Sequence, residues 1–180
     1  MNTPPKEMKA AQRSRRILVI DDNPSICEDF RKILCPTPSP ARLDSLAATI
    51  FGAQAGARDV APSVRARPSK PPLGDEFVVD AVGQGSAGLE AVHRMMRQRT
   101  PYLLAFVDMR MPPGWDGVET CARLWDADPG LQIVICSAYS DYSWHDVVKR
   151  LNRPELRLLQ KPFASKDVLN LAWTLTAKRR

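Results

Sequence analysis

The sequence LLAFVDMRMPPG, residues 103–114, is a continuous apolar run that ends in one carboxylate, Asp108, and then a Pro-Pro-Gly turn. An uninterrupted apolar run of this length is typical of a parallel strand that is buried on both faces. The Pro-Pro-Gly turn ends the strand immediately after the carboxylate. The stretch therefore predicts that Asp108 lies at the carboxyl edge of a parallel sheet, where open α/β folds hold their functional groups.

Three other apolar runs end in polar residues in the same way. Residues 16–20 are followed by Asp21 and Asp22, residues 131–136 by Ser137, and residues 156–160 by Lys161. Residues 77–82 form a further predicted strand. If these strands are parallel in one sheet, their ends meet at one edge and bring the polar side chains together.

The polar residues at this edge suit phosphoryl chemistry with a divalent cation. Asp21, Asp22 and Asp108 offer hard oxygen ligands of the kind that Mg²⁺ prefers. Asp108 could also attack phosphorus as a carboxylate nucleophile. Lys161 and the Ser137 hydroxyl would then stabilise charge on the transferred phosphoryl oxygens.

Taken together, these motifs resemble the receiver domains of bacterial two-component response regulators. The matching segments are Asp21-Asp22, Asp108 with its Met-Pro and Asp-Gly loop, Ser137-Ala138, and Lys161-Pro162-Phe163. The resemblance implies a doubly wound α/β fold whose five parallel strands have the flavodoxin-like order 2-1-3-4-5. It also implies a cis peptide bond between Lys161 and Pro162.

The same resemblance implies a function. Receivers accept a phosphoryl group from a histidine kinase or phosphotransfer protein onto the residue at the position of Asp108, using Mg²⁺. They are phosphoacceptors with self-catalysed phosphorylation and dephosphorylation, and they do not turn over a separate substrate. Phosphorylation switches a protein-interaction surface made by the fourth helix, fifth strand and fifth helix, which could face an output domain or a second copy in a homodimer.

Two departures from the family bear on the lifetime and readout of the aspartyl phosphate. Arg110 and Tyr139 lie two residues after Asp108 and Ser137, so we expect them to flank the phosphate and modulate water access. Leu158 stands three residues before Lys161, where many receivers place a switching aromatic residue. Coupling to the interaction surface could therefore differ, with a tyrosine after Ser137 supplying the moving ring.

The chain is expected to form one receiver domain over residues 15–178, preceded by a disordered basic leader over residues 1–14. Residues 36–76 are an insertion between the first helix and the second strand. Within it, apolar residues at helical spacing predict a short amphipathic helix over Ala41 to Phe51, followed by a flexible loop rich in Pro, Ala and Arg. That helix could pack on its own domain or dock a partner.

Five helices are expected between the strands. The periodicity predicts helices over residues 24–34, around residues 87–95 and after Asp116-Gly117. A fourth helix is expected to begin before residue 147 and to continue through residue 151, and a fifth covers residues 166–178 with Ser165 as its cap.

Gly83-Gln84-Gly85-Ser86-Ala87-Gly88 supports a different function. It matches the G-x-G-x-x-G pattern of dinucleotide sites, between a strand and a helix. The fingerprint normally lies on the first strand-to-helix turn, however, and here it would leave the other motifs unexplained. A nucleotide-cofactor protein, a degenerate receiver acting as a scaffold, and a Mg²⁺-dependent phosphatase remain as alternatives, although Asp21 and Asp22 are adjacent and do not form the D-x-D signature of such phosphatases.

Composition narrows the possible classes of function and the expected cellular location. The net charge is +6, but the basic residues concentrate toward the two ends, so nucleic-acid binding by this chain alone is not expected. No apolar run has the length of a membrane span, and the first residues do not resemble a secretory signal. Four cysteines without C-x-x-C spacing are expected to be reduced thiols, so we expect a cytoplasmic protein without membrane contact.

Overall fold

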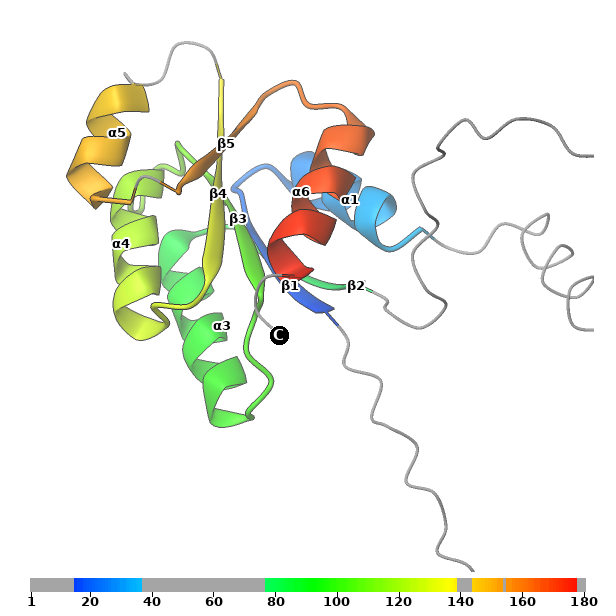
Figure 1. Ribbon diagram of the computed structural model, residues 1–180, viewed down its shortest axis with the longest axis horizontal. Coiled ribbons are helices and arrows are strands. Elements are labelled where there is room, and N and C mark those ends of the chain that lie inside the picture. The colour runs from blue at the N-terminus through cyan, green and yellow to red at the C-terminus, as the bar shows by residue number, and fades with distance from the viewer. Residues whose placement is uncertain (1–14, 37–76, 139–143, 154, 178–180) are drawn as a thin grey trace, which may run out of the picture.

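A computed structural model of the chain describes residues 15–36, 77–138, 144–153 and 155–177. Figure 1 shows a central sheet between two layers of helices. The sheet has five parallel strands in the order β2-β1-β3-β4-β5, which confirms the predicted fold class. The strands are β1 (Arg15–Ile20), β2 (Phe77–Val82), β3 (Leu104–Asp108), β4 (Gln132–Ser137) and β5 (Arg157–Gln160).

Helices cover both faces of the sheet. On one face α3, α4 and α5 pack against β1, β3 and β4, and on the other face α1 and α6 do so. Their bounds are α1 (Pro24–Leu34), α3 (Gly85–Arg97), α4 (Gly117–Ala127), α5 (Trp144–Leu151) and α6 (Ser165–Ala177).

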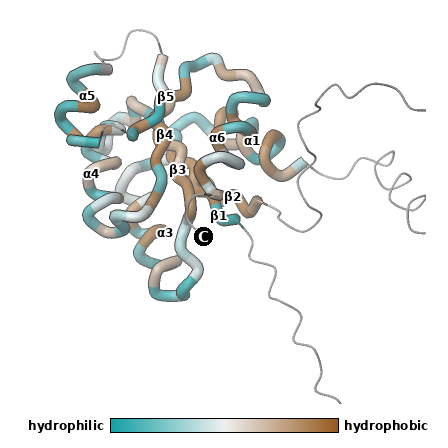
Figure 2. Tube along the Cα trace, viewed as in Figure 1, coloured by the Kyte–Doolittle hydropathy of each residue, from teal (hydrophilic) through white to brown (hydrophobic). Residues whose placement is uncertain are grey.

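Side chains that alternate along β1 contribute to two hydrophobic cores, one on each face of the sheet. Ile17 and Val19 belong to the core under α1 and α6, whereas Leu18 and Ile20 belong to the core under α3, α4 and α5. All four side chains are almost fully buried, as expected for a strand that alternates between two covered faces. Figure 2 shows hydrophobic residues in the central strands, whereas hydrophobic and hydrophilic residues alternate along the helices.

Two helices begin with side-chain caps directly after the strands that carry the predicted site. The Asn23 carboxamide oxygen accepts from the Ser25 N–H at 3.0 Å, and Pro24 occupies the first turn of α1. The Asp116 carboxylate accepts from the Glu119 N–H at 2.7 Å at the start of α4. These caps fix the starts of α1 and α4, the helices that follow β1 and β3.

One prediction is wrong, and several others concern residues that the structure does not describe. Ser165 is the first residue of α6, so its predicted role as the preceding cap is wrong; the Ala164 carbonyl accepts from the N–H groups of Asp167 and Val168 instead. The predicted leader, Tyr139 and nearly all of the insertion lie outside the described residues. None of the helices in the described ranges is both long and apolar enough to cross a membrane.

Candidate functional site

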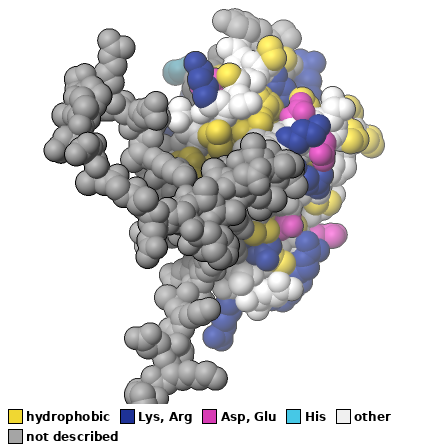
Figure 3. Space-filling model, turned by 90° about the vertical axis from the view of Figure 1, so that its right-hand side faces the viewer, with side chains coloured by type: hydrophobic (Ala, Val, Ile, Leu, Met, Phe, Trp, Pro, Cys, Tyr) yellow, Lys and Arg dark blue, Asp and Glu magenta, His cyan; other side chains and the backbone are white. Residues whose placement is uncertain are grey.

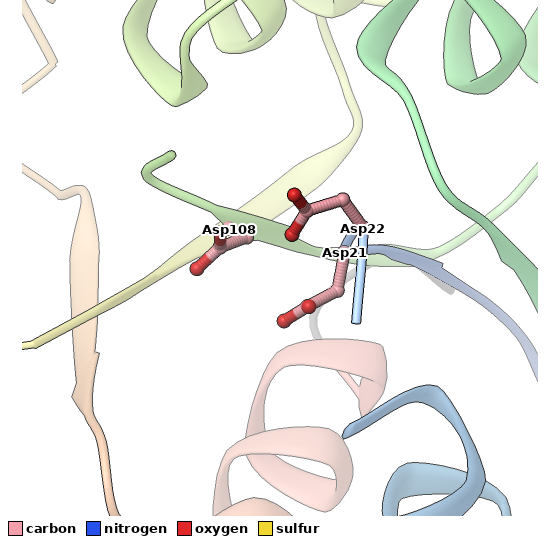
Figure 4. Close-up of side chains that lie close together, drawn as sticks. All are labelled: Asp21, Asp22 and Asp108. Atoms are coloured by element: carbon pink, nitrogen blue, oxygen red, sulfur yellow. The ribbon is translucent and has the colours of Figure 1, made fainter. Parts of the chain in front are cut away.

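Three carboxylates meet at the carboxyl edge of the sheet. Ile20 is paired with Val107 in the β1–β3 register, so Asp21 and Asp108 follow neighbouring strands at the same level. One carboxylate oxygen each of Asp21, Asp22 and Asp108 lies within 4.8 Å of the others. Figure 4 shows the three side chains directed to the same side of this edge. The predicted acidic cluster is therefore present.

Lys161 joins two of these carboxylates. Its Nζ lies 2.6 Å from Asp21 Oδ2 and 2.6 Å from Asp108 Oδ1. The peptide bond to Pro162 is cis, as the resemblance implied, and the Lys161 N–H donates to the Ser137 carbonyl at 2.8 Å. The lysine that follows β5 thus reaches across the edge of the sheet to the ends of β1 and β3.

Backbone groups hold the two buried carboxylates in place. Asp21 Oδ1 accepts from the Asn23 N–H at 2.9 Å, and Asp108 Oδ2 accepts from the Arg110 N–H at 3.2 Å. Gly117 allows α4 to begin against the end of β3, because a Cβ at this position would lie 2.5 Å from the Asp108 carbonyl oxygen. A larger residue at Gly117 would displace the backbone that carries Asp108.

The surroundings shift the pKa of both partners in the central ion pair. Burial raises the pKa of Asp108, and the neighbouring Asp21 raises it further, while the Lys161 ammonium opposes this shift. Burial has the opposite effect on Lys161 and lowers its pKa. The hydrogen bonds of Lys161 with Asp108 and Asp21 together outweigh burial, so the pKa of Lys161 is raised. The pair therefore keeps an ammonium group beside a partly desolvated carboxylate.

The donor set fits a hard divalent cation. When ionised, three carboxylates and one ammonium leave an excess of two negative charges, which one divalent cation would neutralise. Asp21 and Asp108 are buried and Asp22 is exposed, so the cluster is open to solvent on one side. Mg²⁺ binds few protein carboxylates and keeps water and phosphate oxygens as its other ligands, which an open cluster permits.

Ser137 lies at the end of β4 and Arg110 just after the end of β3, at the sheet edge that carries the cluster. Ser137 is the last residue of β4 and is buried, and its hydroxyl donates to the Ala138 carbonyl at 3.0 Å. Arg110 is exposed and follows Asp108 by two residues. Tyr139, predicted to act with it, lies outside the described residues.

The glycine motif has a packing role in this fold. Gly85 and Gly88 are inside α3, and a Cβ at Gly85 would lie 2.2 Å from Thr120 Oγ1 of α4. A Cβ at Gly88 would lie 2.3 Å from Ile20 Cδ1 of β1. These glycines let α3 approach its two neighbours closely, which accounts for their spacing without a phosphate group.

Sequence reasoning missed how the loop after Asp108 is held. The Pro112–Pro113 peptide bond is also cis, and Gln84 Nε2 donates to the Pro112 carbonyl at 3.4 Å. Arg123 lies over the Trp115 ring at 4.1 Å from its centroid. No local pattern signals the Gln84 contact, because it joins the β2–α3 connection to the β3–α4 connection.

Comparisons with known proteins give a consistent result. The family model for the response regulator receiver domain matches residues 73–172. Among solved structures, a response regulator receiver protein from Sinorhizobium medicae WSM419 is similar at 19% identity, with 94% of this chain and 100% of that chain covered and a TM-score of 0.58.

A CheY-like receiver domain protein from Methanospirillum hungatei JF-1 is similar at 18% identity, covering 92% of this chain and 95% of that chain, with a TM-score of 0.58. The receiver domain of the Francisella response regulator 1452 has 15% identity and a TM-score of 0.56, with 93% of this chain and 100% of that chain covered. No curated protein sequence matches the chain. The structural likenesses establish the fold, and the family model covers more than half of the chain; this protein therefore belongs to the response regulator receiver domain family of two-component systems.

Proposed function

We propose that Asp108 accepts a phosphoryl group from the phosphohistidine of a histidine kinase or phosphotransfer protein, with Mg²⁺ as the cofactor. The observation that carries this proposal is the cluster in which Asp21, Asp22 and Asp108 converge and Lys161 contacts two of them. An ammonium group and a divalent cation beside a carboxylate are the charges that phosphoryl transfer requires.

In the proposed step, a carboxylate oxygen of Asp108 forms a bond to phosphorus. The bond between phosphorus and the donor's imidazole nitrogen breaks, and its electron pair stays on that nitrogen. The product is an aspartyl phosphate on this chain and a histidine on the donor. Mg²⁺ held by Asp21, Asp22 and Asp108 would supply positive charge to the phosphoryl oxygens.

Two neighbouring residues would respond to the new phosphate. Lys161 is already 2.6 Å from Asp108. It would donate to a phosphoryl oxygen and offset the negative charge of the phosphoryl group. The Ser137 hydroxyl now donates to the Ala138 carbonyl, and it would exchange this acceptor for a phosphoryl oxygen. This exchange would move the backbone after β4 and so bias a two-state segment.

Arg110 would affect how long the phosphate persists. Its side chain is exposed and its N–H donates to Asp108, so the residue borders the path by which water reaches phosphorus. Tyr139 would act from the β4 side. We propose that these two residues set the rate of self-catalysed dephosphorylation.

The surface that reads this change would be formed by α5, β5 and α6. Leu158 on β5 exposes 43% of its surface, which is unusual for a strand leucine in this protein. A pocket of about 440 Å³ adjoins it and includes Lys161, so the surface is continuous with the phosphorylation site; its lining residues are Leu158, Leu159, Gln160, Lys161, Pro162, Phe163, Asp167 and Leu171. An output domain, another protein or a second copy of this chain could bind there.

We also propose a cytoplasmic location without membrane contact. The four cysteines, Cys27, Cys35, Cys121 and Cys136, all lie in the described ranges and form no disulfide there, which suits a reducing compartment. On the face in Figure 3, Lys and Arg side chains stand beside Asp and Glu in several places. This intermingling gives no support to a nucleic-acid partner on that face.

Beryllium trifluoride, a stable mimic of a phosphoryl group on a carboxylate, tests the proposed switch. We expect amide NMR shifts at Asp108, Ser137 and Lys161 when it is added with Mg²⁺, and further shifts along β5 and α6. The Asp108→Asn variant should show neither set. Shifts that stay local to Asp108 would contradict a switch that reaches β5 and α6.

A further inference from the structure

The exposed carboxyl-terminal end of α3 carries a cluster of arginines at the opposite end of the domain from the phosphorylation site. Arg94, Arg97 and Arg99 lie within six residues, and all three side chains are exposed. Residues 93–99 read HRMMRQR and contain neither an acidic residue nor a lysine. This surface, residues 93–99, lies at the carboxyl-terminal end of α3, whereas the phosphorylation site faces the amino-terminal ends of the helices.

None of these three guanidinium groups has an ion-pair partner among the residues that the structure describes. The carboxylate of Asp80 on β2 is already bound by Arg16 at 3.2 Å and by the Tyr102 hydroxyl at 2.8 Å. Glu90 lies one turn before Arg94 on α3, and it forms no ion pair with Arg94 in the described part of the chain. Positive charge near a helix carboxyl terminus is favourable, which accounts for a basic residue in the last turn. This effect does not account for the backbone conformation of Arg99 or for the exposure of Met96.

The first of these features is the backbone of Arg99. The helix ends in a paired motif in which the Arg99 N–H donates to Met96 and the Thr100 N–H donates to Met95. In this motif the residue after the cap is left-handed and is usually glycine, yet Arg99 occupies it with φ of 57°. The presence of arginine at a position that favours glycine is consistent with a role for its side chain.

The second feature is Met96, which lies between the arginines and exposes 40% of its surface. Leu158 on the proposed receiver surface and Met96 are the two large hydrophobic side chains that are exposed in the described part of the chain. Arginine and methionine are enriched in protein interfaces, where lysine is depleted. Guanidinium groups also bind carboxylates in a bidentate manner.

We propose that residues 93–99 form a docking site for an acidic protein segment, with carboxylates paired to Arg94, Arg97 and Arg99 and an apolar side chain on Met96. The partner chemistry follows from charge complementarity and from the exposed apolar group within the cluster. This site is separate from α5, β5 and α6, so it allows a partner to remain bound whether or not Asp108 carries a phosphate.

Amide NMR titration of the full chain with a synthetic peptide tests this site. The probe is a peptide of alternating Glu and Leu, compared with a peptide of alternating Glu and Ser. We expect saturable shifts confined to the carboxyl-terminal half of α3 and residues 98–100, and weaker binding of the Glu-Ser peptide. Replacing all three arginines with glutamine should weaken binding of the Glu-Leu peptide by about tenfold, because several surface ion pairs of modest strength are lost together.

A control removes exposed basic charge elsewhere, through Arg31→Gln and Lys32→Gln on α1. This control variant should bind the Glu-Leu peptide as the unmodified protein does. The Arg99→Gly variant adds a second measurement, because it should weaken binding while leaving the domain folded. Equal loss in the control variant, shifts spread over the surface, or tighter binding of a DNA duplex or of anionic vesicles at the same ionic strength would overturn the proposal.

Discussion

Lys161 Nζ lies 2.6 Å from Asp108 Oδ1, so an ammonium group is already in contact with the proposed phosphoacceptor. The same nitrogen lies 2.6 Å from Asp21 Oδ2. This arrangement makes Lys161 both a competitor for the cation that the carboxylates would bind and a donor to the phosphate that would form. Its removal should therefore affect the two events in opposite directions.

We expect Lys161→Met to tighten Mg²⁺ binding and to slow phosphoryl uptake. Loss of the ammonium raises the negative excess of the cluster from two charges to three, which should increase Mg²⁺ affinity on the order of tenfold. Uptake from acetyl phosphate should slow by at least about tenfold, because a donor to the phosphoryl oxygens is lost. Calorimetric Mg²⁺ titration and intact-protein mass spectrometry give the two values.

Lys166→Met is the matched control, since it removes one exposed ammonium from α6. It should leave Mg²⁺ affinity and the uptake rate unchanged. Unaltered Mg²⁺ affinity in Lys161→Met would show that the lysine does not share the carboxylates with the cation.

Asp108→Asn should stabilise the metal-free protein at neutral pH. Because burial raises the pKa of Asp108 in the folded state, its ionisation disfavours folding, and the stability of the unmodified protein falls as pH rises through that raised pKa. The advantage of the variant should be small near pH 4, about the ordinary pKa of an aspartate, and should grow toward neutral pH.

Urea unfolding in metal-free buffer at a series of pH values measures this difference. Asp29→Asn, which changes an exposed carboxylate on α1, serves as the control. Mg²⁺ should then stabilise the unmodified protein more than Asp108→Asn, because it binds the folded carboxylates. A stability difference that does not change with pH would contradict the proposed cost of ionising Asp108.

Gly85→Ala should destabilise the protein through one specific contact. The new methyl group would lie 2.2 Å from Thr120 Oγ1, and overpacking of this kind costs about 1–3 kcal/mol. The loss should be largely absent when Thr120 is also changed to alanine, because the side-chain atoms nearest the new methyl are then removed. Thermal unfolding of the two single variants and the double variant gives the coupling free energy.

Gly83→Ala is the control for this cycle. A Cβ at Gly83 would make only ordinary contacts, the nearest at 3.9 Å, so its effect on stability should be small. Additive losses from Gly85→Ala and Thr120→Ala would contradict the packing role assigned to Gly85.

The sequence allowed the strands, most helices and the acidic cluster to be predicted, because the strands that carry the site are apolar runs followed by polar residues. Asp21, Asp108, Ser137 and Lys161 follow such runs, and the parallel order of the strands brings them to one edge. The pairing of Lys161 with both carboxylates could not be read from the sequence, because it depends on side-chain directions across three strands.

The contact between Gly85 and Thr120 could not be predicted from the sequence for a related reason. It joins two helices that are separated by a strand, and the glycine spacing alone also fits a nucleotide site. A local pattern could not distinguish glycine beside a phosphate from glycine beside a neighbouring helix. The position of Ser165 shifted by one residue because helix starts depend on backbone hydrogen bonds as well as on the residue type.

Deleting Pro38 to Pro72 should preserve the phosphoryl chemistry. The Cys35 thiol donates to the Phe77 carbonyl at 3.1 Å, so the two ends of the insertion lie next to each other and a short connection can join them. If the predicted helix over residues 41–51 packs on its own domain, the melting temperature should fall while uptake at Asp108 continues. Unchanged melting with altered self-association would instead indicate that the insertion serves a partner or a second copy.

The most direct measurement is the intact mass of the protein after incubation with acetyl phosphate and Mg²⁺. The unmodified chain should gain the mass of one phosphoryl group, and chelation of Mg²⁺ should prevent this gain. Asp108→Asn should gain no mass under the same conditions, whereas Asp29→Asn should be modified as the unmodified chain is. A phosphoryl adduct that persists in Asp108→Asn, or no adduct on the unmodified chain once Mg²⁺ binding is confirmed, would contradict the assignment of Asp108 as the phosphoacceptor.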